Sequence, residues 1–149
     1  MIELSTRKFN HIKNHQGPIG NGQQISKFLS FNQKYPNAIL RSPNSGIYNC
    51  HGLVFGARRT EINDSNEVSK ILNEDDYVEI EKTEVLPGDV IIYYNLGDAE
   101  HSGIVLEYGF APFFIHKIVS KWGQLEEYIH PANQCPYNFS DVKYYRITK

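Results

Sequence analysis

The stretch YNCHGLVFGARR, Tyr48 to Arg59, places a cysteine, a histidine and a glycine directly ahead of an apolar run. Asn49 is a favourable N-cap residue, and Leu53 and Val54 begin an apolar stripe, so the pattern predicts a helix that starts at Cys50. The partial positive charge and free N–H groups of a helix N-terminus stabilise a thiolate and can receive an oxyanion. Cys50 could be a core thiol, half of a disulfide, a metal ligand or a nucleophile.

The segments before and after this stretch differ in composition and in the structure that they predict. Residues 1–46 indicate an irregular arm, rich in Asn, Gln, Pro and Gly, with one short helix around Gln23–Phe31. After the Cys50 helix, Asp64 is followed by Glu67 three residues later, which is a capping-box pattern for a second helix.

After Asp76 the sequence has the alternating and apolar runs that are typical of β-strands. The break GFAP between the third and fourth of these segments predicts a hairpin. Helices followed by antiparallel strands predict an α+β fold in a single domain, residues 1–149, with the helices packed on the sheet. The predicted strands lie in YVEIEK, GDVIIYYN, HSGIVLEY, FFIHKIVSKW, QLEEYIH and VKYYRIT.

Composition excludes several classes of function. A net charge of −2 gives no basic surface, so we expect no nucleic-acid partner. No apolar run is long enough to span a bilayer, so we expect no membrane partner. The N-terminus has no apolar signal region, which predicts a cytoplasmic protein. Export by a route that needs no cleavable signal is also compatible with this sequence. Composition does not predict the oligomeric state.

The two cysteines, Cys50 and Cys135, form no CxxC pair, and we expect no disulfide between them in a cytoplasmic chain. Cys135 lies in a loop next to proline and is interpreted as structural or incidental. The spacing of the histidines and cysteines matches no known zinc-ligand pattern, so we expect no metal and no other cofactor.

A thiol nucleophile needs a base that takes its proton and returns it to the leaving group. His101 is the candidate, because it lies at the start of the strand HSGIVLEY, and a strand can present an imidazole to a helix N-terminus.

Three motifs together resemble the NlpC-type cysteine peptidases, which are small papain-like enzymes. CHGLVFG resembles the Cys-Ser-Gly-Leu-Val start of their catalytic helix. VLPGDVIIYY is similar to their Pro-Gly-Asp turn and core strand, and HSGIVLEY resembles their His-Val-Gly-Ile strand. The motifs occur in the family's order, with His101 fifty-one residues after Cys50, and the resemblance covers Tyr48 to Trp122, half the chain.

The resemblance implies a papain-like fold in which Cys50 is the nucleophile and His101 the general base and acid. The implied activity is that of a cysteine peptidase or amidase, a thiol hydrolase that cuts an amide bond through a thioester. The family acts mostly on peptides of bacterial peptidoglycan, so a peptide or amide substrate, such as a peptidoglycan stem peptide, is expected.

The family also places a polar residue, often histidine, on the next strand to orient the catalytic imidazole. His116 matches that description, and we favour it. A hairpin centred on GFAP puts His101 opposite Val119 or Ser120, so Ser120, which shares a face with His116, is the other candidate.

Other residues are candidates for contact with substrate. His51 stands where the family has serine and would either bind substrate or face solvent. The Tyr48 hydroxyl could lie near the oxyanion, and Trp122 could form a wall of the substrate groove. Pro87, Gly88 and Asp89 are assigned to turn geometry.

Three alternatives to a hydrolase remain. An acyltransferase would pass the same thioester to an amine or lipid. A toxin or effector would use the same Cys–His site. A non-catalytic binding module would keep the fold, with Cys50 an unreactive thiol of normal pKa.

Overall fold

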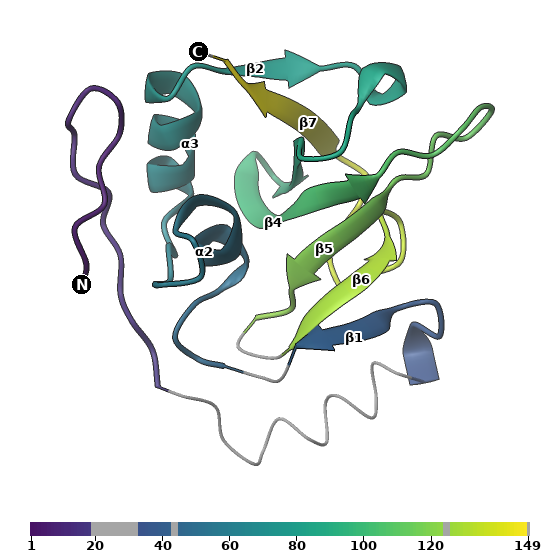
Figure 1. The fold of residues 1–149 in the computed structure, drawn as a ribbon, viewed down its shortest axis with the longest axis horizontal. Coiled ribbons are helices and arrows are strands. Elements are labelled where there is room, and N and C mark those ends of the chain that lie inside the picture. The colour runs from purple at the N-terminus through teal and green to yellow at the C-terminus, as the bar shows by residue number, and fades with distance from the viewer. Residues whose placement is uncertain (19–32, 43–44, 124–125, 149) are drawn as a thin grey trace.

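The computed structural model describes residues 1–18, 33–42, 45–123 and 126–148. The short helix expected around Gln23–Phe31 lies outside the described residues. The described chain forms a seven-stranded antiparallel sheet with two helices beside it, which confirms the α+β prediction (Figure 1). In order, the elements are β1 Ile39–Ser42, α2 Cys50–Phe55, α3 Ser65–Glu74, β2 Tyr77–Ile80, a 3₁₀ turn Lys82–Glu84, β3 Val90–Asn95, β4 Asp98–Glu107, β5 Lys117–Lys121, β6 Glu127–Pro131 and β7 Val142–Ile147.

The strand order in the sheet is β1-β6-β5-β4-β3-β7-β2. All six predicted strands are present, and β1 is the one the sequence did not predict. It lies within the arm expected to be irregular and pairs antiparallel with β6, Leu40 opposite Tyr128. This strand is only four residues long and mostly exposed, so its own sequence has no clear strand pattern. Its pairing with β6 is what makes it a strand.

Both predicted helices begin where their caps indicate. Asn49 caps α2, and its side-chain oxygen accepts a hydrogen bond from the backbone N–H of Gly52 at 2.9 Å. Asp64 caps α3 in the same way. The capping box is incomplete, however, because a Glu67 carboxylate oxygen accepts a hydrogen bond from the backbone of Lys13 at 2.7 Å.

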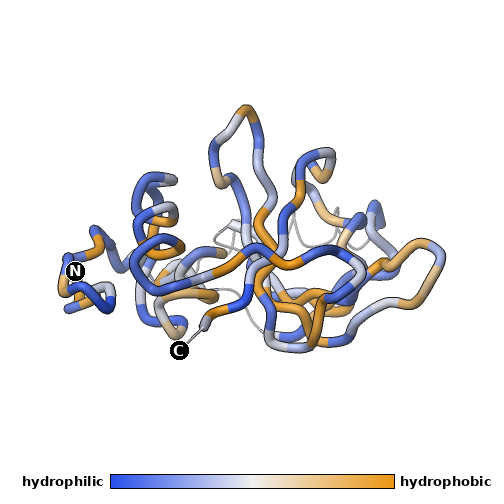
Figure 2. The backbone as a smooth tube through the Cα atoms, turned by 90° about the horizontal axis from the view of Figure 1, so that it is seen from above, coloured by the Kyte–Doolittle hydropathy of each residue, from blue (hydrophilic) through white to orange (hydrophobic). Residues whose placement is uncertain are grey.

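Apolar side chains pack on both sides of the sheet. One cluster joins α3 to the sheet through Val68, Ile71, Val90 and Ile92. A second cluster contains residues of the central strands together with Trp122. Figure 2 shows hydrophobic residues gathered along the middle strands and hydrophilic residues on the outer turns of the helices.

The predicted register of the β4–β5 hairpin is wrong. Val119 pairs with Ile104, not with His101. The connection between the strands is longer than a tight turn at GFAP, and a bulge between Val105 and Glu107 shifts the pairing further. His101 consequently lies beyond the paired part of β5, toward the end of the sheet where α2 contacts β4 and β5.

The Pro-Gly-Asp turn has the structural role that we expected. Gly88 has φ of 93°, a conformation that favours glycine. An Asp89 carboxylate oxygen accepts a hydrogen bond from the backbone N–H of Leu86 at 2.8 Å. Asp89 also forms a two-pronged ion pair with Arg146 at 2.9 Å, which links the turn to β7. In the part of the chain that the structure describes, no helix has both the length and the apolarity needed to cross a bilayer.

Candidate active site

Cys50 is the first residue of α2, and its side chain is buried, with 6% exposed. Gly52 lets the helix pack tightly, since a Cβ at that position would lie 1.7 Å from the carbonyl oxygen of Thr60. Cys50 and Cys135 are both free thiols, so the expected absence of a disulfide between them agrees with the structure. Cys135 is buried in the apolar cluster on the sheet, which fits a structural residue.

The surroundings of Cys50 favour its thiolate. Burial alone would raise the pKa of Cys50, but the adjacent imidazoles of His51 and His101 outweigh burial and keep that pKa well below its usual value. Low thiol pKa combined with neighbouring imidazoles is the environment of a reactive cysteine, whereas a core thiol in apolar surroundings has a raised pKa. Burial raises the pKa of Cys135 in that way.

The two histidines differ in the use of their ring nitrogens. His51 is buried and its ring is fully engaged with β4: Nε2 donates to the carbonyl oxygen of Ala99 at 2.8 Å, and Nδ1 shares a hydrogen bond with the Ser102 hydroxyl at 2.7 Å. His51 does not face solvent, because its contacts hold the ring against the sheet. Burial lowers the pKa of His51, but the Cys50 thiolate and the Ala99 carbonyl raise it above its usual value.

His101, on β4, is fully buried, and neither of its ring nitrogens has a hydrogen-bond partner. Among the described residues, no other buried side-chain nitrogen or oxygen atom lacks one. The ring is positioned by packing: it stacks on Tyr137 with 3.7 Å between centroids and 6° between planes, and it also contacts Tyr93. A buried imidazole whose ring nitrogens are bonded to no other described group, next to a low-pKa thiol, is free to exchange a proton with that thiol.

Neither residue expected to orient His101 is hydrogen-bonded to it. His116 lies just before β5, where its Nδ1 accepts from the backbone N–H of Gly109 at 2.8 Å and its Nε2 donates to the carbonyl oxygen of Lys82 at 2.9 Å. These contacts fix the base of the hairpin, and burial lowers the pKa of His116.

Ser120 belongs to a different buried chain of hydrogen bonds. Its hydroxyl lies 2.6 Å from Nε2 of His130 and accepts from the indole N–H of Trp122 at 3.1 Å. Stacking on Tyr137, and not a hydrogen bond to His116 or Ser120, therefore positions the ring of His101. No motif around Tyr137 could have indicated this role, because the loop that carries it is distant from His101 in sequence.

Trp122 and Tyr48 have other roles than expected. Trp122 does not wall a groove: it is 1% exposed and stacks on Tyr128 with 4.0 Å between ring centroids. The Tyr48 hydroxyl donates to the carboxylate of Glu127, so it is not available to an oxyanion. Burial and the Glu127 carboxylate raise the pKa of Tyr48 to about 12.

A groove of about 730 Å³ opens beside Cys50. Cys50 and His51 line it together with Asp64, Asp98 and Glu100. The groove gives the first turn of α2 an approach from solvent.

Within the described ranges, no three His, Cys, Asp or Glu residues are grouped so that they could hold a metal ion. Comparison of the chain with models of known families, with curated proteins and with solved structures found no match.

Proposed function

We propose that the protein is a cysteine hydrolase that cleaves an amide bond through a thioester formed on Cys50. One observation carries this proposal: a buried, free thiol at the start of α2 interacts with the imidazole of His101, whose ring nitrogens no other described group holds by a hydrogen bond. Such a pair supplies both a nucleophile and a proton carrier.

In the proposed reaction, the Cys50 thiolate attacks the amide carbonyl and a C–S bond forms. The oxyanion lies at the N-terminus of α2, where partial positive charge stabilises it. Protonated His101 gives its proton to the leaving nitrogen as the C–N bond breaks. Water then attacks the thioester and gives a proton to His101, and the C–S bond breaks to release the acid and restore the Cys50 thiolate and the protonated His101.

His101 is a better general base than His51 for a geometric reason. His51 would have to give up its bond to Ala99 or to Ser102 before either nitrogen could carry a proton to or from substrate. His101 gives up no hydrogen bond. We therefore assign to His51 a positioning and electrostatic role beside the thiol.

We also propose that the fold is papain-like and of the NlpC type, and that the substrate is a peptide amide of the bacterial cell wall. The order of the Cys50 helix, the Pro-Gly-Asp turn and the His101 strand supports this assignment. The groove beside Cys50 is compatible with a peptide substrate.

The test is alkylation of Cys50 by iodoacetamide against pH, followed by mass spectrometry, with hydrolysis of cell-wall peptides measured in parallel. We expect Cys50 to react well below the reference thiol pKa of about 8.5, and His101→Ala to slow this reaction and abolish hydrolysis. His116→Ala is the matched control, and it should leave the alkylation midpoint unchanged. Normal titration of Cys50, or full hydrolysis by His101→Ala, would contradict the proposal.

A further inference from the structure

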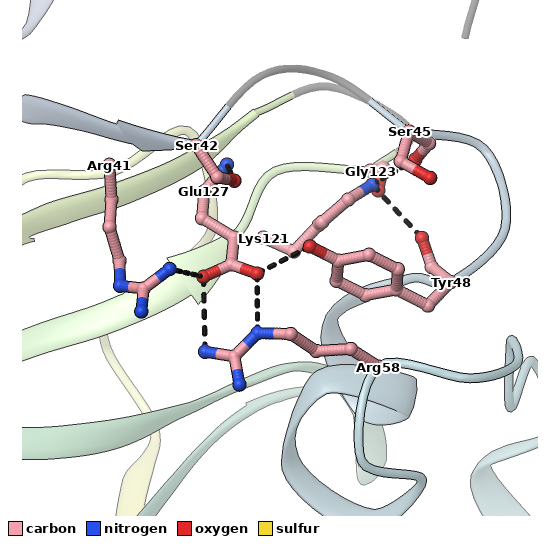
Figure 3. Close-up of polar contacts among 8 residues, drawn as sticks. All are labelled: Arg41, Ser42, Ser45, Tyr48, Arg58, Lys121, Gly123 and Glu127. Carbon is pink, nitrogen blue, oxygen red and sulfur yellow. Dashed lines mark hydrogen bonds and ion pairs between the residues drawn. The ribbon is translucent and has the colours of Figure 1, made fainter. Parts of the chain in front are cut away.

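Lys121, the last residue of β5, is fully buried, although its side chain ends in an amine. Its Nζ donates to three backbone carbonyl oxygens: Ser45, Tyr48 at 2.9 Å and Gly123 at 3.1 Å (Figure 3). An ammonium group has three N–H donors, so all of them are used. Two of the three bonds fix the segment that leads into α2.

Glu127 on β6 binds the same segment through the side chain of Tyr48. Its carboxylate is fully buried and accepts from the Tyr48 hydroxyl, from Arg58 Nε at 2.7 Å and from Arg41 at 3.1 Å (Figure 3). Tyr48 is thus fixed at both ends, at its carbonyl by Lys121 and at its hydroxyl by Glu127. Asn49, the cap of α2, follows directly, and Cys50 comes next.

The charge of Lys121 also acts on the nucleophile. Burial lowers the pKa of Lys121 to about 8, while the charges of Glu127, Cys50, Glu61 and Glu126 raise it. Coupling between two titrating groups is reciprocal, so a Cys50 thiolate that favours the charged amine is itself favoured by that amine. Burial raises the pKa of Cys50, and the imidazoles of His51 and His101 lower it by more than burial raises it.

We propose that Lys121 is a positioning residue that fixes the backbone ahead of Cys50 and uses its buried positive charge to regulate the reactivity of the Cys50 thiol. This inference rests on the proposed role of Cys50 as a nucleophile. It predicts a limit at alkaline pH, since the stabilisation of the thiolate is present while the amine carries its proton, below about pH 8, and is lost above that pH.

The test compares the pH dependence of Cys50 alkylation in the wild-type protein, Lys121→Met and Lys117→Met. Lys117 is the matched control, because it lies at the other end of β5 and pairs with Glu107 at the surface. We expect Lys121→Met to move the alkylation midpoint to higher pH and to slow the reaction at pH 6.5, and Lys117→Met to do neither. A folded Lys121→Met protein with an unchanged midpoint would overturn the inference.

If Lys121→Met does not fold, the coupling can be measured from Lys121 itself. NMR titration of the Lys121 ε-methylene group should give a lower pKa in Cys50→Ala than in the wild-type protein, because the thiolate is gone. Equal pKa values would overturn the inference.

The outcomes separate this inference from the proposed function. A shifted alkylation midpoint in Lys121→Met, with no hydrolysis of any amide by the wild-type protein, would support the role of Lys121 and reject the hydrolase. Hydrolysis that depends on Cys50 and His101, with no shift in Lys121→Met, would do the reverse.

Discussion

The substitution Gly52→Ala adds one methyl group at the tightest contact of α2. The new Cβ would lie 1.7 Å from the carbonyl oxygen of Thr60 and 2.9 Å from its carbonyl carbon, both backbone atoms. Real Cβ contacts essentially never fall below 3.0 Å, so the helix and the Thr60 backbone must separate by roughly 1.3 Å. Overpacking of this kind costs about 1–3 kcal/mol, more than the gain of up to about 1 kcal/mol from replacing glycine by alanine in a helix.

The same displacement would move the first turn of α2 relative to β4. A misplacement of about 1 Å can cost roughly 100-fold in rate, so Cys50 should lose reactivity by a larger factor than stability alone explains. Urea denaturation measures the free energy of unfolding, and iodoacetamide alkylation at pH 7 measures reactivity.

Gly56→Ala is the matched control at the end of the same helix. Its Cβ would meet the nearest atoms at 3.0 and 3.2 Å, which small adjustments can relieve. We expect it to retain most of the stability and reactivity. A Gly52→Ala protein as stable and as reactive as the wild type would refute the packing argument.

Two further predictions concern the aromatic and histidine residues around His101. Tyr137→Phe keeps the ring that stacks on His101 and should leave Cys50 alkylation at pH 7 nearly unchanged. Tyr137→Ala should slow this alkylation and remove about 1 kcal/mol of stacking free energy. Equal alkylation rates in both variants would contradict a positioning role for Tyr137. Burial lowers the pKa of His130 to about 4, while the unfolded chain titrates near 6.5, so the unfolded state binds more protons between these values. The free energy of unfolding should therefore decrease as pH falls from about 6.5 to 4, and His130→Gln should remove up to about 3 kcal/mol of that decrease in urea titrations at pH 7 and 4.5. An identical pH dependence in the variant would show that His130 is not the cause.

Local sequence patterns predicted those features that depend on near neighbours. Asn49 and Asp64 mark the starts of α2 and α3, because the cap residue bonds to backbone groups two or three residues away. The apolar β patterns predicted six strands, and the Pro-Gly-Asp turn gave the correct role for Asp89.

Long-range contacts decided the features that the sequence did not predict. The strand β1 exists because β6 pairs with it, and the β4–β5 register follows a bulge and a long connection that hydrophobic alternation does not encode. His116, Ser120 and Trp122 have the expected polarity or size, but their partners come from other segments of the chain.

The same division applies to the site. The sequence by itself determined that Cys50 begins a helix and that His101 lies on a strand, because caps and alternation act within a few residues. Only the tertiary structure decided that Tyr137 stacks on His101 and that Lys121 supports the segment before Cys50. The physical reason is burial: an amine or imidazole becomes a positioning or reactive group when the folded chain removes water and leaves it with a few specific partners, and those partners are remote in sequence.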